Sequence, residues 1–251
     1  QSDYGCLKKL GQRGIVRVIA TGRSPYSFSK VISKDFPVDY LVFSSGAGIM
    51  RWSTQEVLTT STLPQEKVKE LVAIFRNEKV SFKLLNPIPN NHTYYYFQHG
   101  DLHSDFKKRM TLYTGFETKM EFDPPNFKDA SQFLIILSEL DQFVQLSALC
   151  KGVKVIRATS PLDHLSIWME IFHQDVSKGN ACRFLCQHLG IDIEKTIGIG
   201  NDYNDIDLLQ FVDQSFVVDN APSDLKKVYQ VVSSNKQDGF SEAVKKAGIP
   251  V

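Results

Sequence analysis

The sequence predicts an α/β protein whose doubly wound parallel-sheet core is interrupted by a smaller, inserted α+β domain. Two observations predict this class. At both ends of the chain, short apolar runs typical of buried strands alternate with amphipathic helical segments, as in a parallel sheet covered by helices. Between them the chain changes to one clear helix, aromatic strand-like runs and proline-rich breaks. Residues 1–63 and 161–251 are therefore predicted to form the core, and residues 64–160 the insert.

The opening segment follows the order helix, strand, helix, strand. A helix-like stretch over 6–10 is closed by glycines, and a β-branched run over 15–21 follows it. A helix over 24–34 and a strand over 40–43 come next. The second strand runs into Ser44-Ser45-Gly46, so we expect it to end at a turn.

The closing segment repeats this order. Ser177 is placed to cap a helix over 178–189, which Gly190 terminates and which carries an apolar stripe. A strand over 196–200, a helix over 206–211 and a strand over 216–218 follow. In open parallel sheets, ligands bind at the carboxyl ends of the strands, so the residues that end these strands are the candidates for function.

The insert has a different pattern. It contains a helix over 65–78 and an aromatic strand over 94–97, and prolines break it at 86–89 and 123–125. Its polar and aromatic side chains are typical of solvated faces and half-buried positions, so none is assigned a substrate contact. This group comprises His92, Tyr94, Tyr95, Tyr96, His99, Asp101, His103, Arg109 and Lys119.

Composition excludes several classes of function. Basic residues number 29 and acidic residues 28, a net charge of +1, which gives no broad electrostatic surface for nucleic acid. No apolar run approaches the roughly 20 residues that span a bilayer, and the first residues lack the features of a signal peptide. We therefore expect a cytoplasmic protein with no membrane partner. The four cysteines match no zinc pattern and are expected to be reduced, and the oligomeric state is left open.

Polar groups follow the predicted strands at three places. Thr21 ends the first strand with a free hydroxyl, and Gly22 allows close backbone approach. Lys178 lies in the first turn of a helix, where a cation opposes the helix dipole unless an anion is near. The run 201–205 carries two carboxylates and two carboxamides, hard oxygen ligands that suit Mg²⁺. Each signal alone is explained by a turn, a solvated lysine or a helix cap, but together they describe a phosphate site with a metal.

At these residues the sequence resembles the haloacid dehalogenase superfamily, specifically its Cof-type phosphatases. The second and third motifs of that family match Ala20-Thr21-Gly22-Arg23 and Ser177-Lys178-Gly179, and the fourth matches the cluster 200–205. Segments 218–222 and 234–239 resemble the closing segments of the family. The resemblance covers nearly the whole chain, and the insert lies where the family places its large α+β cap.

The resemblance implies a magnesium-dependent phosphohydrolase acting on a small phosphorylated metabolite, such as a sugar phosphate. In the family, an aspartate takes the phosphoryl group, and a second aspartate and Mg²⁺ assist hydrolysis of the aspartyl phosphate. Carried over by position, Thr21 and Lys178 are the catalytic residues. The implied substrate-binding residues are Gly22, Arg23, Asn204 and Asn220, and the implied metal ligands are Asn201, Asp202 and Asp205.

The first motif of the family, an apolar strand ending in Asp-x-Asp, is absent from these residues. Asp3 is the sole acidic residue before Thr21, and no apolar strand precedes it, so it cannot be given the nucleophile's role. In this fold the missing strand lies between those ending at Thr21 and Gly200, whose backbone groups would otherwise stay unpaired. Three explanations are open: a longer chain, a strand from a partner or swapped copy, or a non-catalytic descendant.

Two other positions depart from the family pattern. Asn201 takes the usual place of the first metal ligand, and a carboxylate moves to Asp202, so which of the two contacts the metal is open. Ser45 stands where relatives often have asparagine. The alternative function is a phosphate-ligand binding or regulatory protein that uses Thr21, Lys178 and the acidic cluster without a nucleophile. A phosphomutase would share the same motifs, and release of free phosphate would separate the two.

Overall fold

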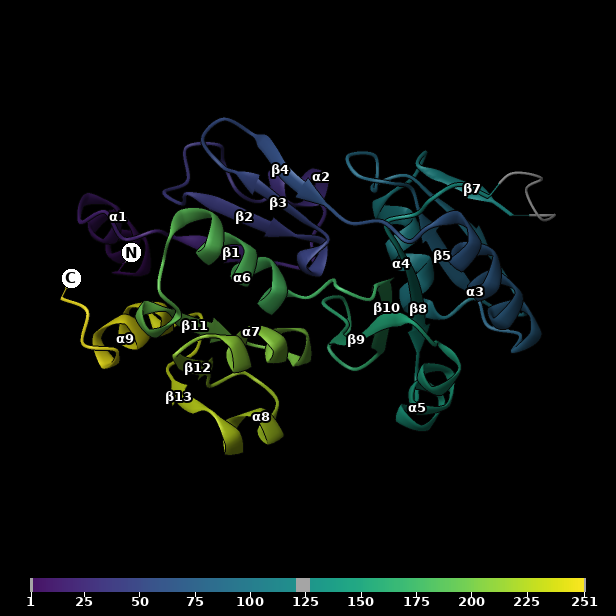
Figure 1. The fold of residues 1–251 in the computed structure, drawn as a ribbon. Coiled ribbons are helices and arrows are strands. Elements are labelled where there is room, and N and C mark those ends of the chain that lie inside the picture. Colours follow the sequence, from purple (N-terminus) through teal and green to yellow (C-terminus); the bar gives the residue numbers. More distant parts are fainter. Residues whose placement is uncertain (1, 121–126, 251) are drawn as a thin grey trace. The chain divides into compact units, whose positions relative to one another are not determined.

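The computed structural model describes residues 2–120 and 127–250, and the chain divides into two compact units (Figure 1). Unit 1 combines Gln1–Thr59 with Ser177–Val251, and unit 2 is Thr60–Val176. Unit 2 is thus inserted into unit 1 along the chain, which is the organisation that the change of sequence pattern predicts.

Strand β10 (Ile167–His173) marks the main difference between predicted and observed boundaries. The sequence assigned it to the core, which was expected to resume at residue 161. In the structure β10 pairs antiparallel with β8 (Gln132–Leu137) on one side and with β9 (Val153–Thr159) on the other. Because hydrogen bonds along both edges hold β10 in that sheet, it belongs to unit 2.

Unit 1 contains two separate sheets. The first has the order β1-β2-β3-β4, with β1 parallel to β2 and β2 antiparallel to β3. The second has the order β11-β12-β13 and is entirely parallel. Among the described residues, no strand pairs with the second edge of β1 or of β11. The strands are β1 (Val18–Ala20), β2 (Tyr40–Phe43), β3 (Gly48–Arg51), β4 (Glu56–Thr60), β11 (Ile197–Gly200), β12 (Gln214–Val218) and β13 (Gln230–Val232).

Helices of unit 1 connect the two sheets. Helix α6 packs Ala181 and Leu185 against the β2–β3 part of the first sheet, and it also lies beside α7 of the second. Near the starts of the strands, Ile15 and Ile197 pack against one cluster made by α1 and α9. The helices are α1 (Ser2–Gln12), α2 (Pro25–Ser29), α6 (Lys178–Leu189), α7 (Ile206–Phe211), α8 (Ser223–Val228) and α9 (Gly239–Lys246), with 3-10 turns η1 (Ser44–Gly46), η2 (Ile193–Lys195) and η3 (Tyr203–Asp205).

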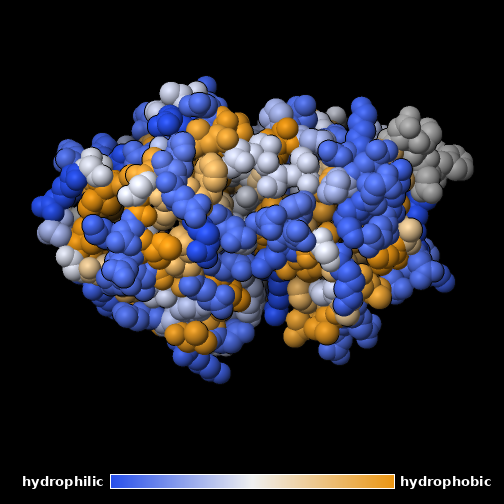
Figure 2. Space-filling view, viewed as in Figure 1, coloured by the Kyte–Doolittle hydropathy of each residue, from blue (hydrophilic) through white to orange (hydrophobic). Residues whose placement is uncertain are grey.

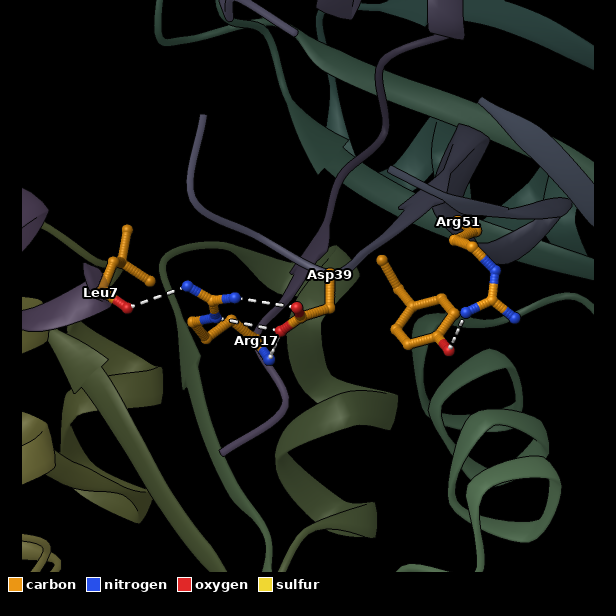
Figure 3. Close-up of polar contacts among 5 residues, drawn as sticks. Leu7, Arg17, Asp39 and Arg51 are labelled. Carbon is orange, nitrogen blue, oxygen red and sulfur yellow. Dashed lines mark hydrogen bonds and ion pairs between the residues drawn. The ribbon is translucent and has the colours of Figure 1, made fainter. Parts of the chain in front are cut away.

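An arginine clamp holds the start of the first sheet (Figure 3). Arg17 forms a two-pronged ion pair with Asp39, with Nε and Nη2 at 2.9 and 2.8 Å from the two carboxylate oxygens. Its backbone amide donates to the same carboxylate at 2.7 Å, and Nη1 reaches the carbonyl of Leu7 at 3.2 Å. The clamp therefore ties α1, the start of β1 and the start of β2 together, as planar guanidinium groups do well.

The predicted helix over 24–34 is shorter in the structure. Helix α2 begins after Ser24, whose hydroxyl accepts from the Ser27 amide, with Pro25 at its first position, but it ends at Ser29. The side chain of Val31 is 58% exposed. Because no apolar surface covers this β-branched residue, burial does not extend the helix beyond its first turns.

Unit 2 is built on one six-stranded sheet of order β7-β6-β5-β8-β10-β9, in which only the β6–β7 pair is parallel. One face is covered by α3, which buries Val68, Leu71, Val72 and Phe75, and by α5. The other face packs against α4 through Phe106. The remaining elements are α3 (Gln65–Asn77), β5 (Phe82–Leu85), β6 (Tyr94–Phe97), α4 (Ser104–Leu112), β7 (Glu117–Lys119) and α5 (Leu140–Leu149).

The surface mixes polar and apolar side chains. On the face drawn in Figure 2, apolar residues are exposed in small groups among polar ones. Across residues 2–120 and 127–250, no helix is both long enough and apolar enough to cross a bilayer. The four cysteines are free thiols, as predicted, and burial raises the pKa of Cys150 to about 11.

Candidate functional site

The polar loops after β1, β2 and β11 converge at one place in unit 1. A methyl group placed on Gly22 would lie 3.4 Å from Ser45 Oγ and 3.6 Å from Asn204 Nδ2. Lys178, at the start of α6, donates from Nζ to Asn204 Oδ1 at 3.0 Å. Four segments that are distant in the sequence thus meet at the carboxyl ends of these strands, where open parallel sheets bind ligands.

The loop after β1 is held by the loop after β2. The Thr21 amide donates to the carbonyl of Val42 at 2.8 Å, and the Thr21 carbonyl accepts from the Ser45 amide at 3.0 Å. The Thr21 hydroxyl oxygen accepts from the Arg23 amide at 3.2 Å. Since a hydroxyl both accepts and donates, its proton remains available to a ligand oxygen.

Lys178 is a buried cation with a defined partner. Its Nζ lies 2.5 Å from Asp205 Oδ1, and both side chains are buried. Ser177 caps the helix by accepting from the Asn180 amide at 3.0 Å, as the sequence predicts. Gly179 brings the helices together, because a methyl group there would lie 2.3 Å from the carbonyl oxygen of Asp207. The absence of a side chain at this position lets α7 approach and bring Asp205 to Lys178.

Asp205 organises the loop after β11. Its second oxygen, Oδ2, accepts from the amides of Asn201 and Asp202 at 2.7 and 3.2 Å. Both carboxylate oxygens therefore have protein donors. Asn201 is exposed, whereas Asp202 is buried. This loop presents the Asn201 side chain outward and folds its backbone around one carboxylate.

The donor set at this loop suits Mg²⁺ in kind, because carboxylate and carboxamide oxygens are the ligands that it takes. Asn201 and Asp202 are the donors that would hold the ion, together with the phosphate of a substrate. A metal ligand at Asp205 would have to share its carboxylate with Lys178 and two backbone amides. Over the described ranges, no group of three or more histidine, cysteine or acidic side chains forms a ready-made metal cluster.

Ser44 and Ser45 are site residues to which the sequence gave no catalytic or binding role. Both are buried and adopt positive φ angles of 48° and 56°. Side-chain-bearing residues avoid this region unless their surroundings impose it, and such strain clusters at functional sites. A turn signal directly after a buried strand was the available clue, but it does not reveal the strained conformation.

Other predicted residues have partners elsewhere. The exposed Arg23 donates from Nη1 to Ser27 Oγ at 3.1 Å, and Asn220 Oδ1 accepts from the Asn235 amide at 3.3 Å. Asp3 lies in α1, where Oδ1 accepts from the amide and hydroxyl of Ser241 at 2.8 and 2.7 Å. Asp3 thus joins α1 to α9.

A family model described as haloacid dehalogenase-like hydrolase matches residues 2–244. The chain belongs to this family. Two bacterial proteins, both named "Putative phosphatase", are similar over most of their length. The protein from Haemophilus influenzae is 24% identical over 247 residues, covering 94% of this chain and 86% of the relative. The protein from Buchnera aphidicola subsp. Baizongia pistaciae is 26% identical over 254 residues, with the same coverage of 94% and 86%.

Solved structures of haloacid dehalogenase-like proteins share the fold. The HAD subclass IIB sugar phosphatase BT4131 has a TM-score of 0.78 at 20% identity, covering 99% of this chain and 92% of that one. The HAD phosphatase BT1666 from Bacteroides thetaiotaomicron has a TM-score of 0.77 at 18% identity, covering 100% and 88%. The predicted fold class and the predicted family are therefore both confirmed.

Proposed function

We propose that this protein is a magnesium-dependent phosphohydrolase that releases phosphate from a small phosphorylated metabolite through an aspartyl phosphate. One observation carries the proposal: a buried lysine, fixed by Asp205 and Asn204, lies where the loops after β1 and β11 meet. A desolvated cation beside a hydroxyl donor such as that of Thr21 is what a transferring phosphoryl group requires.

Each residue has a task in this reaction. The Thr21 hydroxyl donates its proton to a phosphoryl oxygen, and the Gly22 backbone allows that group to approach. Lys178 neutralises the charge that the phosphoryl oxygens carry and orients the attacking carboxylate. Asn204, which accepts from Lys178, keeps the ammonium directed at the site. All of these groups are in place before substrate arrives, so little reorganisation is needed in the transition state.

We assign the nucleophile to an aspartate at the end of a strand that pairs with β1 on one side and with β11 on the other. Among the described residues, β1 bonds β2 only and β11 bonds β12 only. Their starts pack on one apolar cluster, and their ends carry Gly22 and Asn204, which lie close together. A parallel strand between them would satisfy both edges and would end beside Thr21 and Lys178.

Bound Mg²⁺ would polarise the phosphoryl group and offset its charge. We assign Asn201 and Asp202 to hold it and Asp205 to share in the site. Asp205→Ala would then weaken the magnesium dependence of phosphate release. An activity curve against magnesium that matches the parent's would remove Asp205 from the metal site.

The substrate class that we propose is a sugar phosphate or a similar small metabolite of the cytoplasm. Support comes from the names of the similar proteins, two of which are given as phosphatases and one as a sugar phosphatase. The near-neutral charge argues against nucleic acid as a partner.

The test is release of inorganic phosphate by the full-length protein from a panel of sugar phosphates, with Mg²⁺ and with a chelator in its place. We expect turnover that requires Mg²⁺ and that Thr21→Ala or Lys178→Ala reduces about 100-fold or more. The matched control is Thr54→Ala, which changes an exposed threonine of unit 1 and leaves turnover at the parent level. No release from any substrate, with the protein folded, would overturn the proposal.

A second function, phosphate-ligand binding without turnover, is favoured by one observation. Asp205 is tied to Lys178 and to two backbone amides, so it is not free to attack a phosphoryl group. Under this alternative the full-length protein binds a sugar phosphate, loses that binding on Lys178→Ala, and releases no phosphate. The same panel therefore separates the two functions.

A further inference from the structure

Arg109 of unit 2 presents a guanidinium that aromatic rings support and no acid neutralises. It lies in α4, on the sheet face opposite α3, with its guanidinium carbon 4.7 Å from the ring centre of Trp168 and 5.0 Å from that of Tyr113. Its side chain is partly exposed. Within residues 2–120 and 127–250, its guanidinium makes ring contacts but no hydrogen bond or ion pair, so its N–H donors are available to a ligand.

The ring beneath Arg109 is fixed in place. Trp168 donates from Nε1 to Asp105 Oδ2 at 2.7 Å, and Ser160 donates its hydroxyl to the same oxygen at 2.7 Å. Asp105 is fully buried, and Trp168 is nearly so. Asp105 Oδ1 has no hydrogen-bond partner among the described residues, but the two donors on Oδ2 hold the Trp168 ring in one position before any ligand arrives.

The electrostatic surroundings of Arg109 also favour an anion. Lys83 is buried beneath α4, with its Nζ 4.7 Å from the ring centre of Phe106. Burial, followed by repulsion from Arg109, lowers the pKa of Lys83 to about 6, against the opposite influence of Glu117 and Asp105. Arg109 is thus a cation that helps to keep the Lys83 amine neutral. A bound anion would stabilise the charge of Arg109 itself.

We propose that Arg109 is the recognition residue of an oxyanion-binding site within unit 2, which takes the phosphate or carboxylate group of a small molecule. The planar fork of a guanidinium matches two oxygens of either group, and stacking on Trp168 and Tyr113 presets its orientation. Its residues all belong to unit 2, whereas Thr21, Lys178 and Asn204 belong to unit 1, and the proposal does not depend on the proposed hydrolysis.

The two tryptophans of the sequence allow a direct test, because Trp52 lies in unit 1 and Trp168 in unit 2. Trp52→Phe removes the unwanted signal and breaks no hydrogen bond, since the buried Trp52 Nε1 has no hydrogen-bond partner among the described residues. In this background, Trp168 fluorescence is followed while inorganic phosphate or malonate is added at constant ionic strength. We expect a saturable change with at least one anion, and the two arms show whether the site prefers phosphate or carboxylate.

Variants of α4 show which residue is responsible for the anion-dependent change in Trp168 fluorescence. Arg109→Met should weaken binding about tenfold or more, and Arg109→Lys, which keeps the charge without the fork, should give an intermediate affinity. Lys108→Met, which removes an exposed neighbouring charge, should bind like the parent. Phosphate bound at the unit 1 site contributes equally to every titration, because Lys178 is unchanged throughout.

Three results would overturn the proposal: no saturable change with either anion, parent-like binding by Arg109→Met, or parent-like binding by Arg109→Lys. A thermal unfolding curve like the parent's shows that a variant is folded. If Arg109→Met does not fold, Arg109→Lys still tests the proposal. Turnover of sugar phosphates is a separate measurement, so its failure leaves this result standing.

Discussion

Among the described residues, each unit buries one lysine, and the two units compensate for this burial in opposite ways. Lys178 and Lys83 have exposed fractions of only 4% and 1%. Lys178 lies against a carboxylate, with Nζ 2.5 Å from Asp205 Oδ1. Lys83 instead lies against rings, with Nζ 4.4 Å from the ring centre of Tyr94 and 3.4 Å from its hydroxyl oxygen.

The different partners of the two lysines indicate a different role for each buried amine. An ammonium can be buried if an acid compensates it, or if it gives up its proton. The pair in unit 1 keeps a cation at the candidate site, where a phosphoryl group can use it. Burial lowers the pKa of Lys83 in unit 2 to about 6, so its amine is mostly neutral at pH 7 and serves packing.

Removing the unit 1 cation should have the largest effect. Lys178→Met leaves the buried Asp205 carboxylate uncompensated, which should lower the free energy of unfolding by about 3–5 kcal/mol. The measurement is urea unfolding followed through Trp52 in a Trp168→Phe background. Asp205→Asn in the same chain should recover much of the loss, and Lys227→Met, at an exposed lysine of unit 1, should unfold like the parent. Equal stability of Lys178→Met and the parent would refute the buried-pair interpretation.

Separating the pair without removing either charge should have a smaller effect. In Gly179→Ala the new methyl group would lie 2.3 Å from the Asp207 carbonyl, so α7 must move away from α6. We expect a net destabilisation of about 1–3 kcal/mol, despite the better helix propensity of alanine. The same Trp52 signal measures it. Gly190→Ala would not be a matched control, because Gly190 is left-handed, so Gly5→Ala in α1, where the space is open, serves instead. A stabilised Gly179→Ala variant would contradict the close approach.

The pH dependence of unit 2 tests the fate of Lys83. Its pKa is near 10.4 in an unfolded chain and about 6 in the folded protein, so between these values the unfolded state binds the extra proton. Stability of unit 2 should therefore rise with pH above about 6, by at most about 1.4 kcal/mol per pH unit. Urea unfolding followed through Trp168, in the Trp52→Phe background, measures this slope. Lys83→Met should flatten the slope and Lys119→Met, at an exposed lysine, should not; identical slopes in all three proteins would refute the assignment.

Replacing Lys83 at a single pH should change stability in the opposite direction. Methionine has a similar volume, and the amine that it replaces is mostly uncharged at pH 8. By the same linkage, keeping the amine neutral in the folded protein at pH 8 costs up to about 3 kcal/mol, so we expect Lys83→Met to stabilise unit 2 by up to that amount, in clear contrast to the loss from Lys178→Met. A loss as large as that of Lys178→Met, measured through Trp168 at pH 8, would show that Lys83 keeps a charge that its surroundings compensate.

The sequence predicted best where local signals decide the structure. Ser177 caps α6 and Gly190 ends it in the left-handed conformation, so the helix is confirmed at both ends. Strand β2 likewise spans the predicted residues. In each case a capping residue, a glycine or an apolar run fixes the element without help from distant parts of the chain.

What the sequence did not reveal depends on distant contacts. The pairing of Lys178 with Asp205 requires α6 and α7 to meet at Gly179, and no local pattern shows this. Whether Lys83 faces solvent depends on α4, which covers that side of the sheet through Phe106. The second unit boundary was misplaced for the same reason, because only the ladder with β8 and β9 shows where β10 belongs.

The clamp between Arg17 and Asp39 also sets a limit on protein engineering. Gly11 lies inside α1, where a glycine costs about 1 kcal/mol relative to alanine, so it is an obvious target for a stabilising substitution. A methyl group at this position would lie 2.2 Å from Arg17 Nη1. The guanidinium of Arg17 reaches α1 because Gly11 has no side chain there. A substitution that strengthened the helix at Gly11 would displace Arg17, which links α1 to the sheet.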